Sequence, residues 1–105
     1  MKLLSINYIP GKEIEALGMV KGTIVQTKHV GKDFMASMKT LVGGEITSYT
    51  QMLNEARQIA IKRMVDEAKE LGADAVIDIK YGSSQIMAGA AEVIAYGTAV
   101  KYIDQ

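Results

Sequence analysis

Residues 48–72 read SYTQMLNEARQIAIKRMVDEAKELG and carry the clearest structural signal in the chain. An apolar side chain recurs every three or four residues from Tyr49 to Leu71, the spacing of one face of an α-helix. Ser48 and Gln51 have the spacing of a capping box, and Gly72 supplies a C-terminal stop. The stretch therefore predicts a long helix whose wide apolar face needs a partner.

Strand patterns lie on both sides of this helix. β-Branched and alternating residues predict strands over residues 3–9, 19–28, 75–81 and 93–103. A shorter helix is expected over residues 30–42, ending at Gly43 and Gly44, and residues 82–92 are expected to form a loop of small residues. The predicted order is ββααββ. This order favours a single α+β domain over residues 1–105, with a small, mainly antiparallel sheet packed against one long and one short helix.

Two of the predicted strands have informative faces. Regular alternation from Ala75 to Tyr81 predicts that the apolar residues of this strand share one face. In the last strand, Ala95, Gly97 and Ala99 form a face that is nearly bare of side chains. Such a face permits close packing of another backbone or subunit. Together with the wide apolar arc of the long helix, it predicts self-association.

The composition excludes several classes of protein. The 12 basic and 12 acidic residues cancel, which argues against a nucleic-acid-binding surface. The chain contains no cysteine, so disulfides and thiolate chemistry are absent. No apolar run approaches the roughly 20 residues that span a bilayer, and the short apolar start breaks at Asn7 and Pro10 without a cleavage pattern. We therefore expect a soluble, cytoplasmic protein that binds neither nucleic acid nor membranes.

Several parts of the sequence together resemble one known family. They are Gly43-Gly44, Tyr49, Leu53, Ala56-Arg57, Ala60, Met64, Ala68, the run from Leu71 to Val76, and the closing Tyr96 to Val100. This combined pattern, which covers nearly the whole chain, is similar to that of the YbjQ-like family, whose members carry a heavy-metal-binding label. The resemblance implies a small α+β subunit that assembles into a ring-like homopentamer, with rings that can stack in pairs. It implies no established biochemical role.

The metal label has little support in the residues of this chain. Soft metals favour thiolates or clustered imidazoles, and this sequence has no cysteine and a single histidine, His29. His29 and Asp33 could share a metal or a proton, but they supply only two ligands unless a ring brings several copies together. The simpler interpretation of His29 is a partly exposed turn residue. We therefore expect no metal site and no cofactor.

Arg57 is a second candidate for ligand binding. It lies beside the apolar face of the predicted long helix, eight residues after Tyr49. Its guanidinium could hold a carboxylate or phosphate in a cleft between subunits. The alternative is that Arg57 pairs with an acid such as Asp74 or Asp78 and orders a subunit contact.

No arrangement of residues in the sequence indicates catalysis. Nucleophile–base motifs are absent, and the carboxylates are scattered without a spacing that argues for acid–base chemistry. The leading hypothesis is a non-catalytic, homo-oligomeric binding or assembly module. The alternative is a carrier or sensor of a small molecule or metal ion, with sites at subunit junctions that use Arg57, Tyr49, His29 or Asp33.

Overall fold

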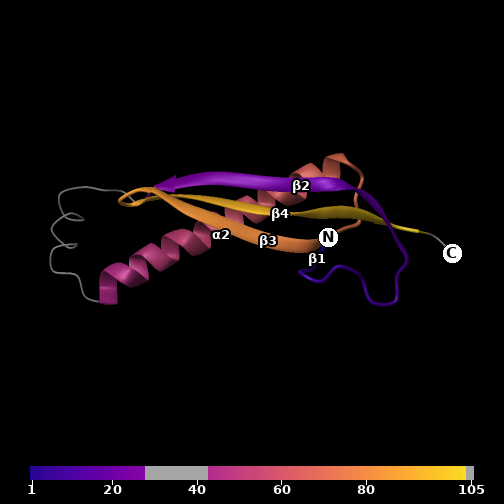
Figure 1. The fold of residues 1–105 in the computed structure, drawn as a ribbon, viewed down its shortest axis with the longest axis horizontal. Coiled ribbons are helices and arrows are strands. Elements are labelled where there is room, and N and C mark those ends of the chain that lie inside the picture. The colour runs from indigo at the N-terminus through magenta and orange to yellow at the C-terminus, as the bar shows by residue number, and fades with distance from the viewer. Residues whose placement is uncertain (28–42, 104–105) are drawn as a thin grey trace.

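The computed structural model describes residues 1–27 and 43–103, in which one helix packs against a four-stranded sheet (Figure 1). The elements are β1 (Lys2–Leu3), β2 (Ile14–Thr27), α2 (Gly43–Glu70), β3 (Ala75–Met87) and β4 (Ala90–Tyr102). The strand order across the sheet is β1-β3-β4-β2. β1 runs parallel to β3, and the other neighbouring pairs are antiparallel. The α+β class is therefore confirmed, with a mixed sheet that is mainly antiparallel.

The helical part of the prediction needs correction. The described residues contain one helix in the order ββαββ, where two helices in the order ββααββ were predicted. The short helix expected over residues 30–42 lies outside the described residues. α2 begins at Gly43, so Ser48 lies within the helix and not at its cap. The helix continues through the capping pattern, because a serine in a helix interior lowers helix stability by only a few tenths of a kcal/mol relative to alanine.

The stretch interpreted as a loop over residues 82–92, whose pairing as an additional strand the sequence left open, is paired in the sheet. β3 continues to Met87 and β4 starts at Ala90, so the two strands form one hairpin whose turn contains Gly89 with a positive φ of 77°. Gly82, Ser83 and Ser84 lie opposite Ile94, Val93 and Glu92 of β4. The residues at this end of β3 are half-buried or exposed on both faces of the strand. Because neither face is buried, the sequence shows no alternation of apolar and polar residues here.

The first two strands have different lengths from those predicted. The expected strand over residues 3–9 is reduced to Lys2–Leu3, and β2 starts at Ile14, five residues before the predicted start at Met19. These shifts leave the strand order along the chain unchanged.

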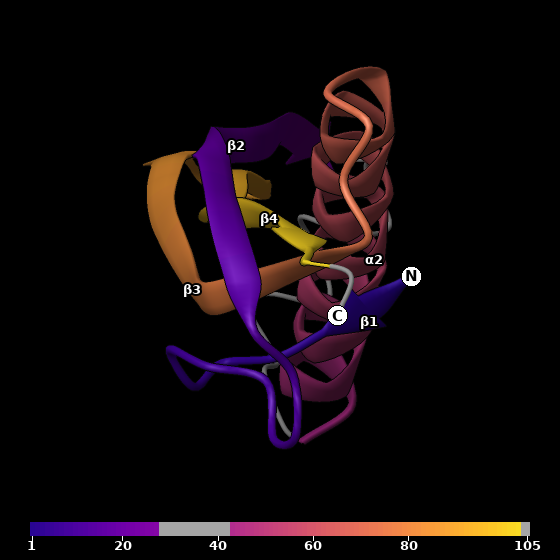
Figure 2. The ribbon, with the colours of Figure 1, turned by 90° about the vertical axis from the view of Figure 1, so that its right-hand side faces the viewer.

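The helix lies very close to the sheet at Gly22. The face of α2 toward the sheet is a buried stripe of small and flexible side chains: Met52, Ala56, Ala60, Met64 and Ala68. A Cβ atom added to Gly22 would collide with the carbonyl oxygen of Ala60 and lie 2.5 Å from the amide nitrogen of Met64. The backbone of the helix therefore rests almost directly on β2 at this point. Figure 2 shows the helix as one layer beside the sheet.

The bare face of β4 packs beneath the same helix. Ala95 and Ala99 are fully buried in one cluster with Val20 and the alanines of α2. The expectation that this face admits another backbone is confirmed, but the backbone is that of the protein's own helix. The face is consequently occupied and does not provide a contact for a second subunit.

A β-bulge at Asp78 breaks the predicted alternation of β3. The register with β4 shifts between Ile77 and Lys80, and Asp78 has a φ of 54°, in the left-handed region that aspartate tolerates better than most residues. Ile77 packs in a small cluster with Ile9, whereas Ile79 packs toward the helix. The prediction of one shared apolar face is therefore wrong, because the bulge turns the strand over at its middle.

Gly22→Ala is expected to lower the free energy of unfolding by about 3 kcal/mol, because its methyl group would collide with the helix backbone. Gly82→Ala serves as the control. Its Cβ would meet only the end of the Ile94 side chain at 3.1 Å, and a loss of about 1 kcal/mol or less is expected. Urea unfolding of both variants makes the comparison, and equal losses would contradict the close approach at Gly22.

Candidate interaction site at the open edge of the sheet

Two of the four candidate ligand residues lie on α2. Tyr49 and Arg57 are both half-buried and lie eight residues apart, which is about 12 Å along the helix axis. Arg57 Nη1 donates a hydrogen bond to Asn54 Oδ1 at 2.8 Å. His29 and Asp33 lie outside the described residues. The described part of the chain therefore does not gather these candidates into one site.

The acids proposed as partners of Arg57 have other partners. Asp74 Oδ2 accepts the amide N–H of Tyr102 at 2.8 Å and lies 3.9 Å from Lys101 Nζ. Asp78 Oδ1 accepts a hydrogen bond from Lys80 Nζ at 2.8 Å. Arg57 makes no ion pair with a carboxylate among the described residues. Within one subunit, Arg57 therefore does not pair with Asp74 or Asp78, and a pairing across a subunit contact stays a prediction.

The Asp78–Lys80 contact makes Lys80 unsuitable as a base or nucleophile. Its hydrogen bond to Asp78 raises the pKa of Lys80, and the negative charge of Asp78 acts in the same direction. A raised lysine pKa means that the contact favours the protonated form of Lys80. The ion pair is therefore present at neutral pH and is lost only as the pH rises through the raised pKa. Lys80 is also exposed, so the ion pair is a surface contact.

Metal-ligating residues do not cluster in residues 1–27 and 43–103. No three histidine, cysteine, aspartate or glutamate side chains in these ranges lie close enough together to hold a metal ion. The described helix is also not apolar enough to cross a membrane.

β2 forms one outer edge of the sheet, and side chains of α2 cover the middle of that edge. The amide N–H of Lys21 donates to Glu67 Oε1 at 3.2 Å, and Arg63 Nη1 donates to the carbonyl oxygen of Thr23 at 2.6 Å. Both backbone groups point away from β4, where another strand would need them. We call this stretch of β2, from Lys21 to Thr23, the covered edge.

β3 forms the opposite side of the sheet, and the N-terminal segment covers only its first half. The amide N–H of Leu4 donates to the Val76 carbonyl at 3.0 Å, and the amide N–H of Ile79 donates to the Leu4 carbonyl at 3.1 Å. No described residue pairs with the outer side of β3 beyond Ile79. We call residues 81–87 the open edge.

The open edge lacks the features that normally protect an unpaired strand. The run from Tyr81 to Ala91 contains no charged residue and no proline, although charges and prolines are common means of blocking an edge. Tyr81, Ile86 and Met87 are all exposed apolar residues, and Met87 is 65% exposed. The open edge is therefore a candidate interaction site.

The register of the sheet shows which backbone groups the open edge presents. The backbone N–H of Lys21 points away from β4, toward Glu67. Along a strand of an antiparallel sheet, successive residues direct their N–H and C=O groups alternately to one side of the strand and to the other. Tyr96 of β4 lies opposite both Lys21 and Lys80, so Tyr96 and Lys80 direct these groups toward each other. The residues that alternate with Lys80, namely Tyr81, Ser83 and Gln85, therefore direct their N–H and C=O groups away from β4. These three residues would form the hydrogen bonds to an added strand.

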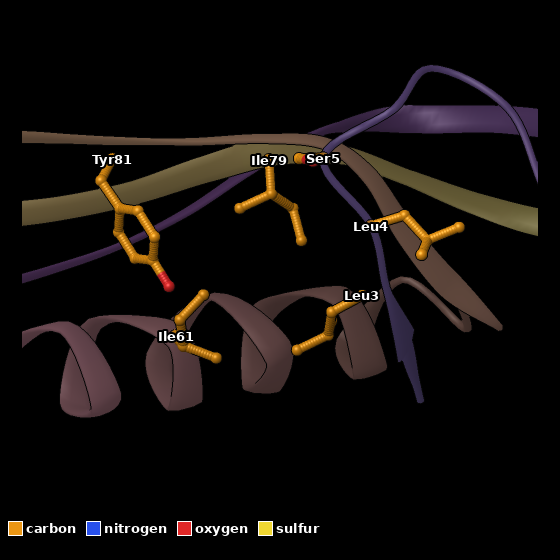
Figure 3. A pocket seen from close by; sticks show the side chains of 6 residues that line it. All are labelled: Leu3, Leu4, Ser5, Ile61, Ile79 and Tyr81. Carbon is orange, nitrogen blue, oxygen red and sulfur yellow. The ribbon is translucent and has the colours of Figure 1, made fainter.

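A small pocket lies between α2, β3 and the N-terminal segment, next to the open edge (Figure 3). It has a volume of about 350 Å³. Its lining is Leu3, Leu4, Ser5, Ile61, Ile79 and Tyr81.

The whole chain was compared with known proteins. The family model YbjQ_1, described as "Putative heavy-metal-binding", matches residues 1–103. The chain belongs to the YbjQ family. It is 61% identical over 103 residues to a UPF0145 protein of Clostridium novyi, a match that covers 98% of this chain and 100% of the relative. A UPF0145 protein of Helicobacter hepaticus is 54% identical, with 98% and 99% of the two chains covered.

One solved structure has the same fold. It is the crystal structure of a protein of unknown function from Pediococcus pentosaceus, assigned to the DUF74 family. The TM-score is 0.63 at 18% sequence identity, and the match covers 98% of both chains. The YbjQ fold is therefore shared between chains of low identity.

Sequence reasoning missed both the open edge and the pocket of this YbjQ protein. The uncharged run after Lys80 was available as a signal, but its small residues were interpreted as a loop. The pocket combines residues from three elements far apart in the chain, so no local pattern could have revealed it.

Glu67→Ala is expected to accelerate amide exchange at Lys21 by about fivefold, because it removes a hydrogen bond worth roughly 1 kcal/mol. Asp66→Ala is the matched control, since Asp66 contacts Lys62 on the same helix and does not touch β2. Hydrogen exchange followed by NMR distinguishes the two variants. Unchanged exchange at Lys21 in Glu67→Ala would show that α2 does not cover this edge.

Proposed function

We propose that this YbjQ-family protein is a non-catalytic, cytoplasmic binding or assembly module that works as a ring-like homo-oligomer. The observation that carries the proposal is the open edge of β3, residues 81–87. A long strand edge without charges or prolines, and without a partner among residues 1–27 and 43–103, is a template for pairing with another chain. Its preservation in a folded protein is best explained by a partner strand. The number of five subunits rests on the family resemblance.

The two edges of the sheet differ in their capacity to pair with another subunit. Lys21 and Thr23 on the covered edge already have partners from α2, whereas Tyr81, Ser83 and Gln85 on the open edge do not have partners on that side among the described residues. The proposed subunit contact therefore uses the open edge, and the ring-like arrangement rests on the family resemblance.

Exposed apolar side chains outside the open edge give further support. Met19 is 74% exposed and Val25 is 54% exposed, both on β2. Their neighbours Val20 and Ile24 point toward the helix, so Met19 and Val25 lie on the sheet face that α2 does not cover. Single exposed apolar residues are ordinary, but here they accompany an unpaired strand edge on the same sheet.

A second candidate function is carriage of a small anion at a subunit junction. The favouring observation is Arg57, a half-buried residue whose guanidinium donates a hydrogen bond to Asn54 and has no described carboxylate partner. A guanidinium with free donors suits a carboxylate or phosphate. Arg57→Ala should then remove bound ligand and leave assembly intact, whereas a loss of assembly alone would refute the carrier function.

The first test is native mass spectrometry of protein purified without added metal or chelator. A five-fold species is the expected result, and extra mass on that species would support the carrier function. A monomer at all protein concentrations in light scattering would overturn the assembly function.

Ser83→Pro tests the open edge directly, because it removes an outward N–H and leaves the ladder to β4 in place. We expect this variant to lose the oligomer and retain its fold. Ser83→Ala is the matched control, since it changes the same side chain and keeps the N–H. Light scattering and circular dichroism measure assembly and fold, and equal assembly of the two variants would exclude the open edge as the contact.

A further inference from the structure

The pocket beside Tyr81 follows from the position of α2. The close contact at Gly22 and the hydrogen bonds of Arg63 and Glu67 hold the helix over β2. β3 lies two strands away across the sheet, so the helix leaves a space beneath it. Leu3 and Leu4 of the N-terminal segment close one end of this space (Figure 3).

The walls of the pocket are continuous with the hydrophobic core. Leu3, Ile61 and Ile79 are partly buried and pack against the buried cluster under α2. Their remaining surface faces the pocket and meets water when the pocket is empty of ligand. Covering this apolar surface would therefore be favourable.

The lining contains hydroxyl groups but no charge. Ser5 and Tyr81 supply the polar atoms, and none of the six lining residues is ionised at neutral pH. A charged ligand group would lose its hydration here without gaining an opposite charge from the lining. The lining therefore selects against ions.

The phenol of Tyr81 extends over the pocket toward Ile61 of the helix (Figure 3). Residues 1–27 and 43–103 provide no hydrogen-bond partner for this hydroxyl, so it can both donate to and accept from a ligand. The pocket volume of about 350 Å³ lies at the lower end of the range for small-molecule sites.

We infer that this pocket binds a small, uncharged, mostly apolar molecule that carries one hydroxyl or carbonyl group. The apolar part lies against Leu3, Ile61 and Ile79, and the polar group bonds to the Tyr81 hydroxyl. The site does not use Arg57, and it requires no contact between subunits. The inference is therefore independent of the assembly proposed above.

The test uses the full chain and two probes of equal length, 1-hexanol and hexanoate. Backbone amide and isoleucine methyl shifts are followed by NMR during titration. We expect 1-hexanol to give saturable shifts confined to residues 3–5, 61 and 79–81. Hexanoate is expected to bind about tenfold more weakly because its carboxylate has no counter-charge in the pocket.

Three variants sharpen the test. Tyr81→Phe should weaken 1-hexanol binding about fivefold through loss of one hydrogen bond. Ile61→Trp should abolish binding by filling the pocket, whereas Gln58→Trp places the same side chain on an exposed helix position outside it and should leave binding unchanged. If Ile61→Trp does not fold, the comparison of Tyr81→Phe with the unaltered protein decides the matter.

Several results would overturn the inference. They are the absence of saturable local shifts, equal binding of hexanoate, and unchanged binding in Tyr81→Phe. Shifts of the same amides on dilution of the protein alone would show that a second copy occupies the pocket. Binding of 1-hexanol that persists when Ser83→Pro has disrupted the oligomer separates this site from the assembly function.

Discussion

The contact between Gly22 and the backbone of α2 determines how the rest of the molecule is arranged. Only a residue without a side chain lets the helix lie at this distance from β2, and the alanines of α2 and β4 extend the close approach on either side. The helix is thereby held over one side of the sheet. Its charged side chains then reach the backbone of β2, while β3 on the other side receives little cover.

This asymmetric cover explains why the features of interest occur together. One edge of the sheet is occupied by Arg63 and Glu67, and at the opposite edge the N-terminal segment is the one described partner of β3, as far as Ile79. The pocket lies between the helix and this segment, and the open edge begins where the pairing of this segment with β3 ends. Fold similarity alone does not determine function. This local geometry, and not the heavy-metal description of the family, is what makes the open edge a candidate contact.

The sequence predicts best where burial imposes a pattern. The long helix was identified because Ala56, Ala60 and Met64 repeat at the spacing of one buried face. The second half of β3 was missed because its residues are half-buried or exposed on both faces. The start of α2 was misplaced because the capping pattern at Ser48 was taken as the start of the helix, although the helix begins earlier, at Gly43. The bulge at Asp78 and the pocket depend on pairings between distant segments, and a local reading of the sequence contains no signal for such pairings.

The strand order also determines when the sheet can form. β4 lies between β3 and β2, and both of these long strands pair with it, although it is synthesised after both of them. On the ribosome, the emerging β2 therefore has no partner strand until residues 90–102 are released. The long-range pairing of β2 with β4 makes formation of this sheet slower than the folding of a helical protein of the same length. A nascent chain with an unpaired β2 is the state in which the protein is most exposed to aggregation.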